Sequence, residues 1–73
     1  MIAIPKNDTY PDLQPNQEYE IERVFKDGYI ILKGSQRRYK SNCFVIRHKG
    51  KKISFNEAYR LYKLEVVKRK LGM

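Results

Sequence analysis

The sequence predicts a β+α domain, a small antiparallel sheet of three to five strands followed by a C-terminal amphipathic helix. Tyr19, Ile21 and Phe25 alternate with Glu18, Glu20 and Glu22, which is the period-two pattern of a half-buried strand. Glycine turn signals then recur at residues 28, 34 and 50, and a Ser-x-x-Glu capping box begins at Ser54. A chain of 73 residues forms one domain at most, so residues 1–73 are expected to fold as a single unit.

Residues 1–16 contain all three prolines of the chain, Pro5, Pro11 and Pro15. Proline removes a backbone donor and restricts the residue before it. This segment is therefore predicted to be an extended N-terminal arm and not a helix or a central strand.

The sheet is expected within residues 17–53. Asp27-Gly28 favours a tight hairpin, because both positions tolerate positive φ, and residues 29–32 are apolar on both faces, as in a central strand. Residues 36–40 fit a largely exposed strand, residues 43–46 a further apolar strand, and residues 52–53 a brief return after the Lys49-Gly50 turn.

The helix is predicted over residues 54–71, with the Ser54 hydroxyl as its cap and Gly72 placed to end it. A helical wheel gives it two apolar faces. One face is needed to dock on the sheet and holds Phe55, Ala58, Tyr59, Tyr62 and Val66. The opposite face holds Leu64, Val67 and Leu71.

The stretch from Leu13 to Phe44 resembles small SH3-like barrels of the kind found among bacteriophage early gene products. The matching pattern is Leu13-x-x-Asn16-x-x-Tyr19-x-Ile21, then a hairpin across residues 27–32, then Arg38-Tyr39 ahead of Phe44. The resemblance implies a barrel-like sheet and covers a little under half of the chain, whereas the long C-terminal helix departs from it. Such folds host nucleic-acid binders, peptide binders and enzyme inhibitors, so the fold alone does not define a function.

Charge is divided between the two parts of the chain. Residues 1–32 hold three basic and six acidic residues, a net charge of −3, and residues 33–73 hold thirteen basic and two acidic residues, a net charge of +11. The sum is the net charge of +8. A positive field concentrated on part of a small protein attracts polyanions, which indicates a nucleic acid or an acidic protein surface as the partner.

Two basic groups are the candidate nucleic-acid-binding residues. The first group is Arg37, Arg38 and Lys40 with Tyr39 between them, where arginine could hold phosphate and tyrosine could stack a base. The same group also fits a charged edge strand that resists aggregation. The second group is Arg47, Lys49, Lys51 and Lys52 around the Gly50 turn, which fits either a loop that contacts phosphates or a solvated hairpin tip.

The stripe of Leu64, Val67 and Leu71 is the candidate protein interface. Nucleic-acid binding does not require it, and an exposed aliphatic patch marks an interaction surface. We expect a second copy of the chain or a host protein to cover it. The alternative is that the N-terminal arm folds over it through Ile2, Ile4 or Leu13.

Several classes of function are not expected. A domain this small leaves little room for a deep pocket, and no catalytic triad, metal cluster or glycine-rich phosphate loop is visible, so no enzyme, cofactor, metal or small-molecule substrate is predicted. The single cysteine and the absence of a long apolar run predict a soluble cytoplasmic protein without a membrane role, in the bacterial host cytoplasm if phage-encoded.

The first hypothesis is a non-catalytic nucleic-acid-binding module. The alternative is a phage-encoded inhibitor or modulator that docks on a host nucleic-acid-processing or defence enzyme.

Overall fold

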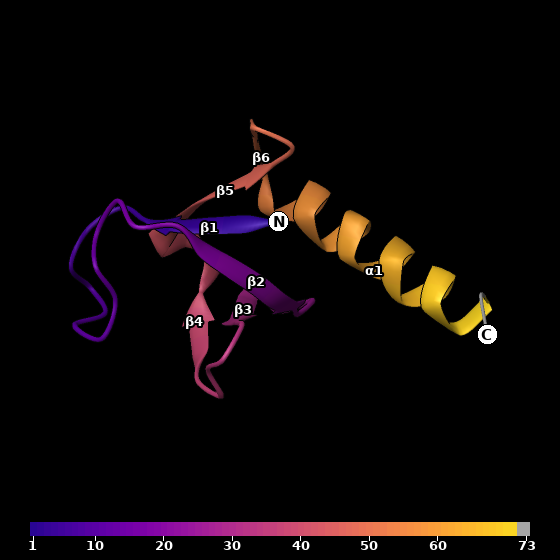
Figure 1. The fold of residues 1–73 in the computed structure, drawn as a ribbon, viewed down its shortest axis with the longest axis horizontal. Helices are drawn as coiled ribbons and strands as arrows, with labels where there is room; N and C mark the ends of the chain where they lie inside the picture. Colours follow the sequence, from indigo (N-terminus) through magenta and orange to yellow (C-terminus); the bar gives the residue numbers. More distant parts are fainter. Residues whose placement is uncertain (72–73) are drawn as a thin grey trace.

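A computed structural model of the chain describes residues 1–71 and has six strands followed by one helix (Figure 1). The elements in chain order are β1 (Ile2–Pro5), β2 (Tyr19–Val24), β3 (Tyr29–Leu32), β4 (Arg38–Lys40), the 3₁₀ turn η1 (Ser41–Cys43), β5 (Phe44–His48), β6 (Lys51–Ile53) and α1 (Phe55–Leu71). The strands form one antiparallel sheet in the order β4-β3-β2-β1-β5-β6. The β+α class is thus confirmed, with an open sheet that has six strands where three to five were expected.

The prediction for the N-terminal arm was wrong at its first residues. Ile2–Pro5 forms β1, which lies between β2 and β5 in the interior of the sheet. Pro5 is compatible with this place because it is the last residue of the strand, where only one ladder donor is lost. The Pro5 carbonyl accepts a hydrogen bond from Asn16 at 3.2 Å, and the ladder to β5 continues through Lys6, whose amide donates to Cys43 at 3.0 Å.

The tight turns lie where glycine was expected to allow them. Gly28 has a φ of 96° between β2 and β3, and its amide donates to the Phe25 carbonyl. The prediction of a two-residue turn at Asp27-Gly28 was wrong, because Asp27 does not have a positive φ and four residues separate Val24 of β2 from Tyr29 of β3. Lys49 and Gly50 both have positive φ, at 52° and 80°, which is the geometry of a two-residue turn between β5 and β6. This turn places the second basic group at the tip of a hairpin.

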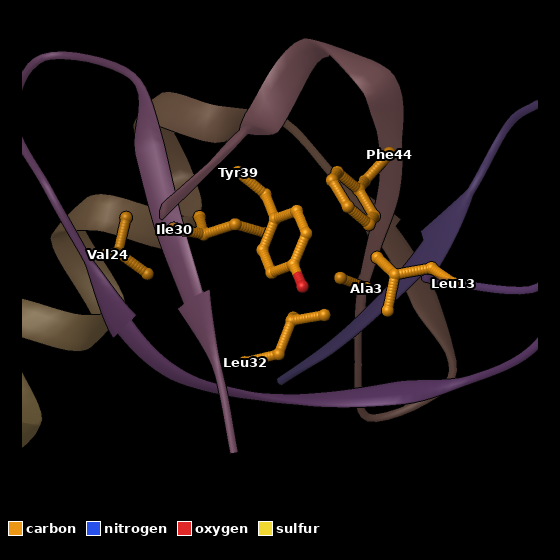
Figure 2. Close-up of a cluster of buried hydrophobic side chains, with 7 residues drawn as sticks. All are labelled: Ala3, Leu13, Val24, Ile30, Leu32, Tyr39 and Phe44. Atoms are coloured by element: carbon orange, nitrogen blue, oxygen red, sulfur yellow. The ribbon is translucent and has the colours of Figure 1, made fainter. Parts of the chain in front are cut away.

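One hydrophobic core lies inside the curled sheet (Figure 2). β3 contributes Ile30 and Leu32, β4 contributes Tyr39 and β5 contributes Phe44, so strands from both ends of the sheet reach the same core. The remaining buried members of this cluster are Ala3, Leu13 and Val24. The pairing shifts between Ile21 and Arg23, where an irregularity in β2 increases the bend of the sheet.

The helix α1 begins one residue after Ser54, whose hydroxyl accepts a hydrogen bond from the Glu57 amide at 3.2 Å. This contact confirms Ser54 as the cap. The predicted docking face is also confirmed, because Ala58 is fully buried and Phe55, Tyr59 and Tyr62 pack against the core. The later turns of α1 extend away from the sheet (Figure 1). Gly72, predicted to end the helix, lies outside the described residues.

Candidate functional site

The acidic and basic parts of the chain meet in the fold. Each of the three ion pairs found in residues 1–71 joins a basic residue that follows Leu32 to an acidic one that precedes it. The pairs are Lys33 with Glu20 at 3.4 Å, Arg37 with Asp12 at 3.2 Å and Arg38 with Asp27 at 3.6 Å. The positive field of the first basic group is therefore partly neutralised by carboxylates of the N-terminal part.

The stacking role expected of Tyr39 is not compatible with its place in the fold. Its side chain alternates with the exposed Arg38 and Lys40 along β4 and points into the core, where only 1% of its surface is exposed (Figure 2). Its ring packs against Tyr10 and Phe44, with ring centroids 4.8 Å and 5.9 Å away. A nucleic-acid base has no access to this ring, so Tyr39 is a core residue.

The hydroxyl of Tyr39 explains why the loop between β1 and β2 is held in place. It donates a 2.6 Å hydrogen bond to Asp12, a residue of that loop, whose other carboxylate oxygen accepts from Arg37. The Arg37 guanidinium also lies over the rings of Tyr10 and Tyr39, at 5.1 Å and 5.5 Å. Arg37 is thus a structural contact between the loop and β4 as well as an exposed cation.

These contacts shift two pKa values in opposite directions. The hydrogen bond from Tyr39 lowers the pKa of the Asp12 carboxyl below its ordinary value, and the Asp12 backbone and the Arg37 charge act in the same direction. Burial raises the pKa of the Tyr39 hydroxyl above its ordinary value, and the hydrogen bond to Asp12 adds to this effect. Near neutral pH, both shifts favour the carboxylate and the neutral phenol that this contact requires.

Asp12 should make stability depend on pH in the acid range. Because its folded pKa is depressed, its contribution is fully present above the unfolded pKa of about 3.9 and is lost as pH falls through the lower folded value. As the pH is lowered from 6, the melting temperature should fall less in Asp12→Asn than in the wild type. Asp8→Asn, in the same loop, should show the same fall in melting temperature as the wild type. Equal falls in the wild type and in Asp12→Asn would contradict the role assigned to Asp12.

Arg38, on the exposed side of β4, is also engaged within the fold. Its guanidinium lies 4.1 Å from the ring centroid of Phe25 and within ion-pair distance of Asp27. Lys40 is exposed and makes no ion pair within residues 1–71. Lys40 is thus the only cation of the first basic group that forms no ion pair with a carboxylate in the described part of the chain.

The β5–β6 hairpin presents the second basic group differently. Arg47, Lys49, Lys51 and Lys52 are all exposed, and none forms an ion pair with any carboxylate in the described part of the chain. Arg47 and Lys52 are directly opposite each other across the two strands, an arrangement of like charges that is unfavourable without an anion nearby. The Arg47 guanidinium also donates to the Gly50 carbonyl at 3.3 Å and so spans the turn.

The hairpin and the helix form one surface. His48 and Lys49 line a hollow of about 320 Å³ together with Leu61, Leu64 and Lys68 of α1. A second, shallower hollow of about 490 Å³ is lined by α1 residues alone, and Leu64 borders both hollows. Its lining residues are Asn56, Tyr59, Arg60, Lys63, Leu64 and Val67.

The second apolar face of the helix is open to solvent. Leu64 is 54% exposed and Val67 is 47% exposed, whereas Ile2 and Ile4 belong to β1 and Leu13 is in the core. The alternative in which the N-terminal arm covers this face is therefore wrong for Leu64 and Val67. The side chain of Leu71 lies outside the described set, although its backbone ends α1.

Arg60 and Lys63 are not among the site residues predicted from the sequence, although both border the hollow at Leu64. A signal was present, because Arg60 precedes Leu64 by four residues and Lys63 precedes Val67 by four residues along the helix.

Within residues 1–71, no cluster of three or more potential metal ligands is found. α1 is too short and too polar to span a bilayer, and no other helix of that part of the chain is long or apolar enough to do so.

Comparisons with protein-family models, with curated proteins and with solved structures find no match to this chain.

Proposed function

We propose that this protein is a non-catalytic binding module that holds the phosphate backbone of a nucleic acid on its β5–β6 hairpin. The observation that carries the proposal is the contrast between the two basic groups. Arg37 and Arg38 each contact a carboxylate, whereas Arg47, Lys49, Lys51 and Lys52 have no ion-pair partner in the described part of the chain. Exposed cations in close proximity to one another attract a polyanion and release its counterions on binding.

The proposed contact reads phosphates and not bases. The two-residue hairpin tip contains Lys49 and is flanked by Arg47 on one strand and by Lys51 and Lys52 on the other. It offers charge and reach, which phosphate contacts need, but no fixed array of donors for base edges. The buried place of Tyr39 removes the stacking residue that the sequence suggested. Binding should therefore depend strongly on salt and little on sequence.

A salt titration tests this proposal. The hairpin offers four cations, so if about four phosphates are neutralised, the slope of log affinity against log salt on duplex DNA should be about −3.6. Anisotropy of labelled duplexes with two unrelated sequences should give similar affinities. The absence of binding at ~50 mM salt, or an almost flat response to salt, would contradict the proposal.

We further propose that the sheet is a variant of the SH3-like barrels that the sequence resembles. The order of the first five strands, the curling of the sheet around one core and the 3₁₀ turn before β5 support this interpretation. β6 and α1 are additions to such a barrel, and β6 carries Lys51 and Lys52 of the proposed phosphate-binding hairpin.

A second candidate function is docking on another protein, as a small modulator of a host enzyme would do. The exposure of Leu64 and Val67 favours it, because neither side chain has a use in phosphate binding. Both functions are compatible in one molecule, since the hairpin cations and the aliphatic helix face are different residues.

A further inference from the structure

We propose that the outer face of α1 around Leu64 and Val67 binds an acidic amphipathic helix of another protein. This inference rests on the second candidate function, docking on a protein, and names the class of partner. It does not depend on nucleic-acid binding by the hairpin.

The apolar part of the surface is suited to a small aliphatic anchor. Leu64 and Val67 are one turn apart on the helix, and both border the hollow of about 490 Å³. Tyr59 borders the same hollow while packing on the core, so the base of the hollow belongs to the folded body. A partner helix can insert leucine-sized side chains at spacings of three and four into such a surface.

The rim of this surface is positively charged. Arg60 and Lys63 border the larger hollow, and Lys49 and Lys68 border the neighbouring hollow that shares Leu64. Glu65 is the only acidic residue that lines either hollow. Aspartate and glutamate beside the aliphatic anchors of a partner would therefore meet cations on both sides of Leu64.

A second copy of this chain has the wrong charge for this place. α1 carries five basic residues and only two acidic ones, Glu57 and Glu65. Packing two copies of this face together would bring lysines and arginines of one helix against those of the other, which is unfavourable at an interface. The observations thus favour an acidic partner over self-association.

A nucleic acid is also a poorer occupant of this face. Phosphates accept hydrogen bonds from cations but gain nothing from contact with Leu64 and Val67, whereas a protein helix buries both. The aliphatic side chains therefore distinguish this surface from the hairpin.

Three synthetic helical peptides of equal length test the proposal by fluorescence anisotropy. The first has leucines at spacings of three and four, flanked by glutamates. The second has the same composition in scrambled order, and the third has lysines in place of the glutamates. We expect the first to bind wild-type protein at least tenfold more tightly than the other two.

Variants of the protein then locate the binding site. Leu64→Ser and Val67→Ser should each weaken binding of the first peptide roughly tenfold, because each removes buried aliphatic area without changing the charge. Lys63→Gln should weaken it more than Lys51→Gln, which removes the same charge away from the two hollows. Duplex DNA affinity should stay at the wild-type value in Leu64→Ser, and circular dichroism melting should stay unchanged because the side chain is exposed.

Each contrary outcome identifies what fails. Equal binding of the ordered and scrambled peptides would show that only charge matters and would overturn the proposal. Preferred binding of the lysine peptide at the same face would keep protein docking but reject an acidic partner. A wild-type dimer in sedimentation that Leu64→Ser converts to monomer would assign the face to a second copy, and a parallel loss of DNA affinity in Leu64→Ser would assign it to nucleic acid.

Discussion

Tyr39→Ala should unfold most of the protein under conditions in which the wild type is folded. Removing a large buried aromatic side chain costs about 3–5 kcal/mol, and a domain of this size has a net stability of only about 3–5 kcal/mol. Tyr39 is almost completely buried and contacts Tyr10 and Phe44, so little water can enter to relieve the cavity. Urea denaturation followed by circular dichroism measures the loss.

Two further variants separate packing from hydrogen bonding. Tyr39→Phe keeps the ring but removes the donor to Asp12, and it should cost only about 1 kcal/mol because Asp12 is exposed and water can replace the hydroxyl. Tyr29→Ala, a half-buried tyrosine on the neighbouring strand, should cost less than Tyr39→Ala. If Tyr39→Ala melts like the wild type but loses DNA affinity, the tyrosine is a binding residue after all.

The second large effect is expected at the β5–β6 hairpin. Lys51→Gln combined with Lys52→Gln should reduce the magnitude of the log–log salt slope on duplex DNA by about 1.8, since each lost phosphate contact accounts for about 0.9. If the double variant and the wild type bind DNA equally at ~1 M salt, the variant's affinity should be lower by a factor on the order of a hundred at ~50 mM salt. Both lysines are exposed, so the thermal melting profile should hardly change.

Arg37→Gln combined with Arg38→Gln is the matched control, because it removes the same total charge. These arginines contact Asp12 and Asp27, so the salt slope should change by much less than in the hairpin variant. The control should instead lower the melting temperature, because it also removes the guanidinium contacts to Tyr10 and Phe25. Equal losses of DNA affinity in both double variants would show that total charge alone governs binding.

Local signals in the sequence predicted much of this fold. The helix was expected from residue 54 to residue 71 and is found at Phe55–Leu71, because a serine cap marks its start without help from distant residues. The turns at Gly28 and Gly50 were predicted for the same reason, since positive φ is a local requirement. Helical spacing also placed Leu64 and Val67 on a face away from the docking face, whereas their exposure needed the fold, because the N-terminal arm could have covered them.

Features that depend on distant parts of the chain were missed. Pro5, at the end of β1, led residues 2–5 to be predicted as an arm and not as a strand. The partners of β1, which are β2 and β5, lie far along the sequence. Tyr39 lies between cations in the sequence, and its burial depends on Asp12 and Phe44 on other elements. The pairing of Arg37 and Arg38 with aspartates likewise required the fold, because neither aspartate is a neighbour in sequence.

The position of β1 also has a consequence for the order in which the chain can fold. Ile2 pairs with Arg47, so one ladder of β1 cannot form until nearly all of the sheet sequence is available. The β2–β3 and β3–β4 ladders join neighbouring segments and can form early, whereas joining β1 to β5 requires closure of a long loop. During synthesis on the ribosome, β1 can pair with β2 as soon as that strand emerges, but its other edge must stay unpaired until β5 follows.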